Sequence, residues 1–339
     1  MEDIISFEAL YESMQKCKRG VIWKDSVAHF VLNAVEEINK LHTHLEEGTY
    51  KTRSTKVFTV DGPKKRQAMG VAFRDRVYQR SLNDNAIYPA LVRTFIYDNG
   101  ACQKNKGTDF SRRRLNCFLQ KFYRKHGTKG YVLQCDIKGY YPNMQHSVAE
   151  ATFKKHLPPD IYEAAVKVLH DQYGDGVGYF PGSQMIQLAG IAVLNDLDHY
   201  IKERLHIKFY IRYMDDFLLI HEDPAYLEYC REEIRKKLDD IQFTLHPKKT
   251  RIYPLKDGIK FLGFYHFLSD TGKIYLRVDP KNVKAERKKL RRLANLAKKG
   301  YISRDKVDEC FRSWKDHARK GNSHNLLKRM DTFYEDLWR

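Results

Sequence analysis

Hydrophobic residues at intervals of three and four dominate both ends of the chain, and this spacing predicts amphipathic helices. Residues 1–50 form one such region, and the chain after Pro280 forms another in three successive segments. The apolar positions are Phe7, Leu10, Met14, Val31, Val35, Ile38 and Leu41 in the first region, and Leu290, Leu293, Ala294, Val307, Cys310, Phe311, Trp314, Leu326, Leu327, Met330, Phe333 and Leu337 in the second.

The middle of the chain adds short strand patterns. Residues 131–137 (YVLQCDI) predict one strand, and residues 208–221 (KFYIRYMDDFLLIH) place two apolar runs about a two-residue break, which predicts a β-hairpin. Residues 51–66 combine β-branched positions with a cationic turn, so we expect a strand or hairpin with a basic tip. Residues 183–205 are apolar on most faces and begin at a potential N-cap, Ser183, which predicts a buried helix.

Helices and strands mix without strict βαβ alternation, so the predicted fold class is α+β. The sequence contains no internal repeat and no Pro/Gly-rich linker. We therefore expect its subdomains to pack as one body.

Charge narrows the choice of partner. The chain has 61 Lys and Arg against 43 Asp and Glu, a net charge of +18. This excess favours a polyanionic ligand such as nucleic acid, although a charge that serves only solubility is the alternative. The apolar runs are too short to span a bilayer, and the N-terminus MEDIISFEAL is acidic where a signal peptide would be basic, so we expect a cytoplasmic protein without membrane contact.

The six cysteines show no C-x-x-C spacing. This excludes a zinc knuckle and predicts reduced, buried thiols.

Candidate catalytic groups lie at the ends of the predicted strands. Asp215 and Asp216 adjoin at the hairpin break, where like charges repel unless a cation lies between them. A solvated Asp-Asp turn is the common alternative. Asp136 ends the other strand region, and if the two are neighbours, Asp136 and Asp215 can chelate Mg²⁺. Two such ions would activate a primer 3′-OH and stabilise the leaving pyrophosphate, which is nucleotidyl transfer.

Two segments resemble palm motifs A and C of reverse transcriptases. The first is Asp136 followed by the aromatic pair Tyr140 and Tyr141, and the second is Tyr213-Met214-Asp215-Asp216, about eighty residues later. Further segments resemble that family in its order, over about residues 55–320. They are 63–80 in the fingers, 103–108 as a template or primer contact, 178–191 as motif B, 246–250 as motif D and 261–264 as the primer grip.

The resemblance implies a right-hand polymerase fold. Residues 1–50 would be a helical extension, 51–125 the fingers, 126–275 the palm with the motif B helix at 183–205, and 276–339 a helical thumb. It also implies an RNA-directed DNA polymerase that uses Mg²⁺, with Mn²⁺ as an alternative.

Site residues follow from the same motifs. The implied metal site comprises Asp136, Ile137, Asp215 and Asp216, with Lys249 protonating the pyrophosphate. Tyr141 would be the steric gate against a ribose 2′-OH, and its alternative role is palm core. The implied dNTP contacts are Lys64, Lys65, Arg66, Arg74, Tyr140, Tyr141, Gly182 and Gln187. The implied nucleic-acid contacts are Lys104, Lys106, Lys284, Arg287, Lys288, Arg291 and Arg292, although any of these cations could be merely solvated.

The expected partners are an RNA template, an RNA/DNA duplex and dNTPs. The chain lacks the Val-Thr-Gly thumb signature of retrons and has Ile186-Gln187 where enzymes of diversity-generating retroelements usually have Ser-Gln. In motif B, Pro181-Gly182 is one residue shorter than in many relatives. What remains resembles small stand-alone bacterial reverse transcriptases, many of which act in antiphage defence with a cognate non-coding RNA, an accessory protein or a second polymerase subunit. A diversity-generating enzyme is the alternative role.

Two functions of other kinds compete with DNA synthesis. One is a catalytically silent RNA-binding protein with a polymerase fold, which the three carboxylates disfavour. The other is an RNA-dependent RNA polymerase, which the bulky Tyr141 disfavours.

Overall fold

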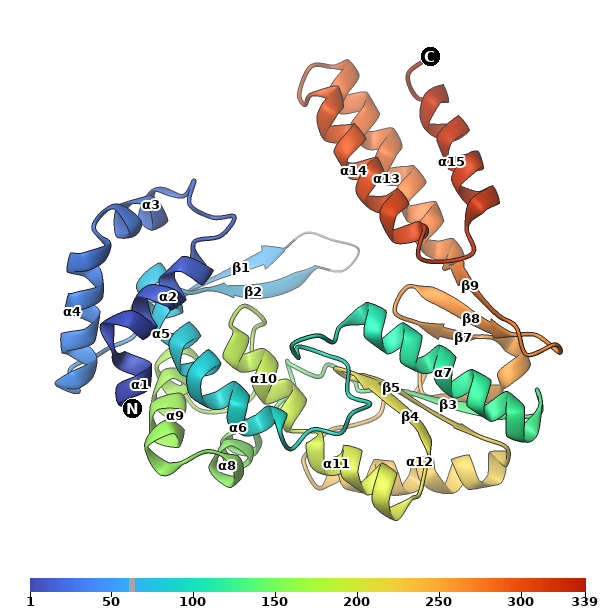
Figure 1. The fold of residues 1–339 in the computed structure, drawn as a ribbon, viewed down its shortest axis with the longest axis horizontal. Helices are drawn as coiled ribbons and strands as arrows, with labels where there is room; N and C mark the ends of the chain where they lie inside the picture. The colour runs from blue at the N-terminus through green and yellow to red at the C-terminus, as the bar shows by residue number, and fades with distance from the viewer. Residues whose placement is uncertain (61–64) are drawn as a thin grey trace.

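The computed structural model of the chain describes residues 1–60 and 65–339 (Figure 1). Its N-terminal layer is helical, as predicted. Leu10, Met14, Ile38 and Leu41 are buried. Val35 is 65% exposed, because Ala34, four residues before Ile38, occupies the buried face of this helix instead. The helices are α1 (Glu2–Ile5), α2 (Phe7–Cys17), α3 (Asp25–Leu32) and α4 (Ala34–Glu46).

The next segment contains the predicted hairpin, which extends from the helical layer in Figure 1. Its strands pair antiparallel from Lys56 opposite Gly70 to Val60 opposite Arg66. A helical run then packs α5 against α2 and continues through one π-helical turn. The elements are β1 (Lys56–Val60), β2 (Arg66–Gly70), α5 (Phe73–Leu82), η1 (Asn83–Ile87), α6 (Tyr88–Val92) and α7 (Thr108–His126).

A four-stranded antiparallel sheet in the order β4-β5-β3-β6 forms the centre of the molecule. Most of its apolar side chains are buried, and the strands within 131–137 and 208–221 confirm the strand predictions. The strands are β3 (Tyr131–Asp136), β4 (Phe209–Tyr213), β5 (Asp216–His221) and β6 (Arg251–Pro254). The helices of this region are α8 (His146–His156), α9 (Pro159–Tyr173), α10 (Gln184–Ala192), α11 (Asn195–His199), η2 (Tyr200–Arg204) and α12 (Pro224–Asp239).

The prediction of one helix over 183–205 is wrong, although its N-cap is confirmed. Ser183 Oγ accepts from the Ile186 backbone N–H at 3.2 Å. The helix stops at Ala192 and restarts at Asn195. The Ile191 carbonyl, which would bind the Asn195 N–H in a continuous helix, instead accepts from Arg212 Nη2 at 3.0 Å.

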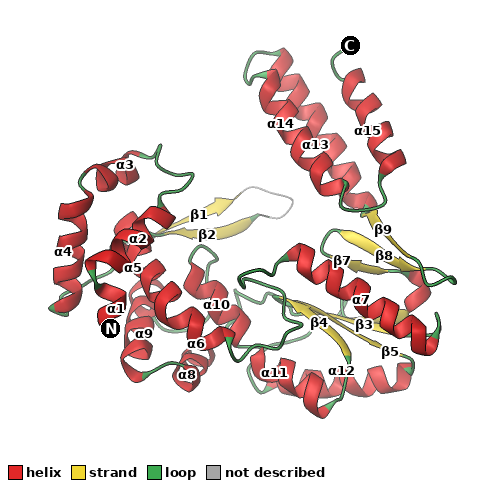
Figure 2. Ribbon diagram, viewed as in Figure 1, coloured by secondary structure: helices red, strands yellow, loops and turns green. Residues whose placement is uncertain are grey.

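A smaller sheet leads from the central sheet to three C-terminal helices, which stand apart from the rest in Figure 2. These helices enclose a core of their own around Leu290, Val307, Phe311 and Met330. The elements are η3 (Leu255–Asp257), β7 (Ile259–Phe261), β8 (Phe264–Leu268), β9 (Ile274–Val278), α13 (Pro280–Lys298), α14 (Arg304–Ala318) and α15 (His324–Asp336).

The six cysteine thiols are free, and Cys135 and Cys230 are buried as predicted. Cys102 contradicts that prediction because it is exposed. It lies in a loop, and its backbone φ is 49°. None of the helices in the described residues is long and apolar enough to cross a bilayer.

Candidate active site

Strand register brings the predicted carboxylates to one end of the central sheet. Asp136 ends β3 and lies directly opposite Asp216, the first residue of the antiparallel β5. Asp216 also pairs with Tyr213 of β4, so the two-residue hairpin turn consists of Met214 and Asp215. The neighbouring strands that the prediction required are therefore present.

The hairpin turn is held from beneath by a fully buried arginine. Met214 has a φ of 58°, which is unfavourable for an L-residue with a long side chain. Arg212 Nη1 donates to the Met214 carbonyl at 3.0 Å. The same guanidinium makes a bidentate ion pair with Asp198, at 2.7 Å from Nε and 2.5 Å from Nη2. Both side chains are 0% exposed, so the turn rests on a rigid polar contact within the core.

Asp216 is in an environment that disfavours its negative charge. Burial, followed by the nearby Asp215 and Asp136, raises the pKa of Asp216 to about 7, against a hydrogen bond from Gln134 that lowers it. Gln134 Nε2 lies 3.5 Å from Asp216 Oδ1 and is fixed by the Lys260 carbonyl at 3.0 Å. A cation beside these three carboxylates would favour their ionised forms.

Lys249 reaches the same place. Its ammonium Nζ lies 2.7 and 2.8 Å from the two carboxylate oxygens of Asp136. The loop that carries it is joined to β3 by the His246 N–H, which donates to the Asp136 carbonyl at 2.7 Å. The predicted proton donor is thus next to the predicted carboxylates.

The donor chemistry fits a hard divalent cation, because carboxylate oxygens are the ligands that Mg²⁺ and Mn²⁺ prefer. Across residues 1–60 and 65–339 no three acidic, His or Cys side chains already form a closed metal cluster. Lys249 is hydrogen-bonded to both oxygens of Asp136. A metal ion bound by Asp136 would share these oxygens with the lysine or displace it, because each carboxylate oxygen has two lone pairs. The bonds between this strand end and the 244–246 segment use the Asp136 carbonyl and the Lys138 N–H. They do not use the Ile137 carbonyl, so this backbone oxygen suits the metal-site role predicted for Ile137.

The two tyrosines after Asp136 point to different places. Tyr140 is 3% exposed, and its hydroxyl donates to the Gly190 carbonyl at 2.5 Å, so its side chain is core. The prediction that this side chain contacts a nucleotide does not fit the structure. Tyr141 packs across α10 at Gly190, where a Cβ would meet its hydroxyl oxygen at 2.9 Å. Burial raises the pKa of the Tyr141 hydroxyl, which has no hydrogen-bond partner among the described residues.

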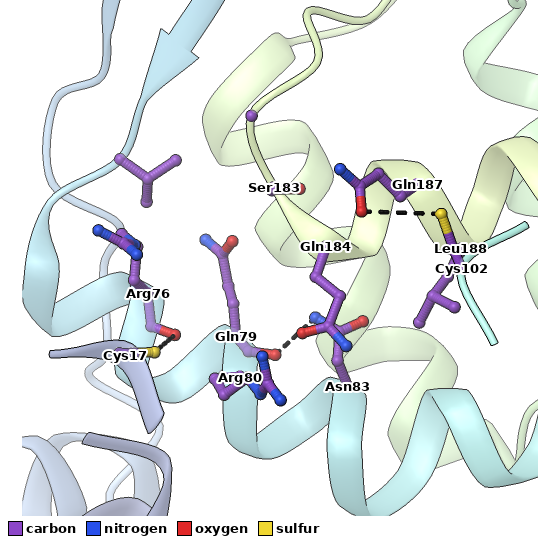
Figure 3. Close-up of a pocket in the computed structure, with 12 residues that line it drawn as sticks. Cys17, Arg76, Gln79, Arg80, Asn83, Cys102, Ser183, Gln184, Gln187 and Leu188 are labelled. Atoms are coloured by element: carbon purple, nitrogen blue, oxygen red, sulfur yellow. Dashed lines mark hydrogen bonds between the residues drawn. The ribbon is translucent and has the colours of Figure 1, made fainter. Parts of the chain in front are cut away.

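Gly182 and Gln187 line a cavity of about 430 Å³ between α5 and α10 (Figure 3). Gly182 permits a close approach of two backbones, because a Cβ there would lie 2.4 Å from the Met69 carbonyl oxygen. Gln187 Oε1 accepts a weak bond from Cys102 Sγ at 3.9 Å. The structure thus brings these two predicted nucleotide contacts together.

The family assignment follows from a comparison with known proteins. A family profile described as "Reverse transcriptase (RNA-dependent DNA polymerase)" matches residues 63–266, more than half of the chain. The chain belongs to the reverse transcriptase family. No curated protein sequence matches it.

A solved structure of telomerase from Candida albicans, in complex with a TWJ fragment of telomeric RNA, shares the fold of this reverse transcriptase family member. The TM-score is 0.51 at 11% sequence identity, over 71% of this chain and 51% of that chain. The chain thus spans about half the length of the telomerase chain. The likeness confirms the predicted α+β polymerase fold.

The cations predicted to contact the dNTP from the fingers do not all lie at the same cavity. Arg74 does not reach the Gly182 cavity, because its guanidinium donates to the Lys51 carbonyl at 2.5 Å and pairs with the buried Asp75. It lines another cavity, beside Phe58. The cavity of Gly182 instead receives Arg76 and Arg80, which sequence reasoning missed although they lie in the fingers segment.

Lys64, Lys65 and Arg66 are the other cations predicted to contact the dNTP. Lys64 and the side chain of Arg66 lie outside the described residues. Lys65 is exposed.

The loop cations also differ. Lys106 donates to the Tyr97 and Asn99 carbonyls at 2.9 and 3.0 Å, and burial lowers the pKa of its ammonium. These bonds hold the loop and use two of the three ammonium N–H groups, so the nucleic-acid contact of Lys106 stays a prediction. Lys104 is exposed, with its ammonium 5.5 Å from the centre of the Tyr88 ring.

The predicted thumb cations lie along α13 on two faces. Lys288 and Arg292 are exposed to solvent. Arg287 and Arg291 lie over the Phe333 ring of α15, at 5.4 and 5.0 Å from its centre. With Lys284 they line a groove of about 840 Å³ between α13 and α15.

Proposed function

We propose that this chain is an RNA-directed DNA polymerase that extends a primer 3′-OH with dNTPs. The observation that carries the proposal is the register of β3 and β5, which sets Asp136 opposite Asp216 with Asp215 in the adjoining turn. Three carboxylates from two segments of the chain lie at one end of the sheet, above a buried ion pair, and this arrangement supports a cation site over a solvated turn.

Asp136, Asp215 and Asp216 would hold Mg²⁺ or Mn²⁺, with the Ile137 carbonyl beside them. When bound, the metal supplies a lowered pKa at the primer hydroxyl and offsets negative charge on the triphosphate. In the reaction the primer oxygen bonds to the α-phosphorus as the bond to pyrophosphate breaks. Lys249 would then give its proton to the pyrophosphate, from a position in which Asp136 holds its ammonium at 2.7 Å.

Tyr141 would select deoxynucleotides. Its ring is fixed against Gly190 of α10, so it cannot withdraw along that direction to admit a 2′-hydroxyl. Lys65, Arg66, Gly182 and Gln187 would contact the triphosphate and sugar. Guanidinium and ammonium groups suit this task because they form charge-assisted hydrogen bonds with phosphate oxygens.

An RNA template and an RNA/DNA duplex are the proposed partners, with the exposed cations of α13 following the duplex phosphates. The telomerase with the related fold was solved with a fragment of telomeric RNA. The finer role that we propose is cytoplasmic action with a cognate non-coding RNA in antiphage defence, and its support is the motif resemblance alone. Sequencing of RNA that copurifies with the protein, together with phage plating on cells carrying Asp215→Asn, tests that role.

Primer extension on a primed RNA template with Mg²⁺ and dNTPs tests the enzymatic proposal. Wild type should extend the primer, and Asp215→Asn, which keeps the shape and removes the charge, should not. Asp196→Asn, an exposed aspartate paired with Lys155 away from the site, is the matched control and should extend normally. Extension by Asp215→Asn at the wild-type rate would refute the proposal. Absence of synthesis by wild type with either metal and with NTPs would favour a silent RNA-binding protein.

A further inference from the structure

The side chain of Gln134 shares one face of the central sheet with two polar neighbours. Gln134 lies two residues before Asp136 in β3, and strand residues two apart point to the same face. Asp216 of β5 lies opposite Asp136. Tyr253 of β6 lies opposite Val132, which is also two residues from Gln134. Asp216 and Tyr253 are therefore diagonal neighbours of Gln134, one on each adjoining strand.

The contacts of Gln134 fix the orientation of its amide. Two acceptors lie next to its Nε2, the Lys260 carbonyl at 3.0 Å and Asp216 Oδ1 at 3.5 Å. Its Oε1 lies 3.0 Å from the Tyr253 hydroxyl. An amide oxygen turned toward two acceptors would be repelled, whereas the NH₂ group donates to both. The Tyr253 hydroxyl must then donate to Oε1, so this bond holds the amide in the orientation that presents an N–H to Asp216.

The Lys260 carbonyl connects this row to the smaller sheet. Lys260 lies in β7, the outermost strand in the order β7-β8-β9, and the carbonyl on the outer edge of this strand accepts from Gln134. Phe261 pairs with Phe264, so the β7–β8 turn consists of residues 262 and 263. This turn lies in the segment predicted to be the primer grip. Gln134 thus joins the Asp216 carboxylate to the β7–β8 hairpin.

A donor at a fixed position limits how the Asp216 carboxylate can rotate. The terminal torsion of an aspartate is broad and nearly two-fold, so its two oxygens exchange easily without such a partner. The N–H of Gln134 favours the rotamer in which Oδ1 faces Gln134. Loss of such an outer partner typically weakens metal binding or activity by about 10- to 100-fold. Since 3.5 Å is long for a hydrogen bond, we expect an effect at the lower end of that range.

We propose that Gln134, oriented by Tyr253, is a positioning residue that holds the Asp216 carboxylate for divalent-metal binding and ties it to the β7–β8 hairpin. The inference rests on the proposed function, because it takes Asp216 to be a ligand of the catalytic metal. The alternative is that Gln134 only joins the two sheets. That alternative predicts a loss of stability without any change in metal affinity.

Titration of the full chain with Mn²⁺, followed by electron paramagnetic resonance, tests the inference without primer, template or dNTP. The binding that Asp216→Asn abolishes defines the site. Gln134→Met keeps the length of the side chain and removes the amide, so Kd at this site should rise by about tenfold. Tyr253→Phe keeps the ring under the Arg251 guanidinium, 4.8 Å from its centre, and frees the amide to turn. It should raise Kd by about threefold, as expected for loss of one hydrogen bond.

Two substitutions of the same kinds serve as matched controls. Gln172→Met removes an amide that is 7% exposed in α9. Tyr226→Phe removes a hydroxyl that donates to the Leu205 carbonyl at 2.8 Å. Both should leave Kd for Mn²⁺ unchanged. Urea denaturation shows that each variant is folded, and Tyr253→Phe carries the test if Gln134→Met is not.

The double variant Gln134→Met/Tyr253→Phe shows whether Tyr253 acts through Gln134. Once the amide is absent, loss of the hydroxyl should cost nothing further, so the double variant should bind Mn²⁺ as Gln134→Met does. In primer extension, both single variants should lower kcat and leave KM for dNTP within about twofold, because neither side chain is proposed to contact the nucleotide.

Equal Mn²⁺ affinity of wild type and Gln134→Met would overturn the inference, whether or not the variant is less stable. Losses that multiply in the double variant would also overturn it, because Tyr253 would then act separately. Equal binding by wild type and Asp216→Asn would overturn both the inference and the proposed metal site. Site-specific binding that Gln134→Met weakens, in a wild-type protein that synthesises no DNA, would support the inference and contradict the proposed polymerase.

Discussion

The palm hairpin and the thumb helix α13 both carry predicted functional residues, but they position them by different means. Asp136 and Asp216 meet through a ladder between segments about eighty residues apart, and the turn between β4 and β5 rests on the buried Arg212. Lys288 and Arg292 are placed by the local helical period alone and lie exposed. We therefore expect the palm to depend on a few specific contacts and the thumb on the sum of many weak ones.

Removal of the buried arginine should give the largest effect. Arg212→Met leaves the buried Asp198 without a counter-charge, with only the Tyr210 hydroxyl donating to it, so the free energy of unfolding should fall by about 3–5 kcal/mol, measured by urea denaturation. DNA synthesis should also be lost, because the bond to the Met214 carbonyl disappears.

The double variant Arg212→Met/Asp198→Leu separates the two effects. It should regain much of the stability, since no charge stays buried, but not the activity. Recovery of both would show that Arg212 stabilises the fold without positioning the turn.

Substitution of the exposed Lys249 tests whether a single side chain of the palm takes part in catalysis. Lys249→Met should lower kcat by about a hundredfold with little change in KM, because the proton donor beside Asp136 is lost. The neighbouring exposed Lys248→Met serves as the control and should leave kcat within twofold. Equal effects of the two substitutions would mean that Lys249 contributes only to the general positive field.

The sheet that joins the two regions should show a pH-dependent stability. Burial, followed by the charge of Arg112, lowers the pKa of His266 from 6.5 to about 4. Between these values the unfolded ring takes up a proton while the folded ring stays neutral, so unfolding becomes easier as the pH falls. The free energy of unfolding should drop by about 2 kcal/mol between pH 7.5 and pH 5 through this group alone.

Urea denaturation of wild type and His266→Gln at the two pH values isolates that contribution. The variant should lose less stability on acidification, by about the same amount. Parallel losses in both proteins would show that other groups cause the acid sensitivity.

The thumb should give the smallest single effects. Substitution of Lys288 or Arg292 by Gln should weaken duplex binding by less than about tenfold and reduce the slope of log K against log salt by about one unit each. Substitution of Arg287, whose guanidinium also contacts Met330 and Phe333, should in addition lower the melting temperature. Slopes that stay unchanged in the exposed pair would remove them from the nucleic-acid interface.

Local patterns were sufficient to predict the helices, the hairpin and the Ser183 cap, because capping and periodicity depend on near neighbours. They failed where distant groups act. The helix ends at Ala192, where the distant Arg212 of β4 binds the Ile191 carbonyl, and the partners of Arg74 and Lys106 cannot be read from residue spacing. Arg76 and Arg80 were missed, because their place at the Gly182 cavity becomes visible only in three dimensions.

Single-turnover dNTP incorporation on a primed RNA template with Mg²⁺ tests most directly whether the opposed carboxylates form one catalytic unit. The comparison uses Asp136→Asn, Asp216→Asn and the double variant. Groups that act together lose activity once, so each single substitution should cost at least about a thousandfold and the double variant little more. Small losses that multiply in the double variant would contradict the account, because they would show that Asp136 and Asp216 act independently.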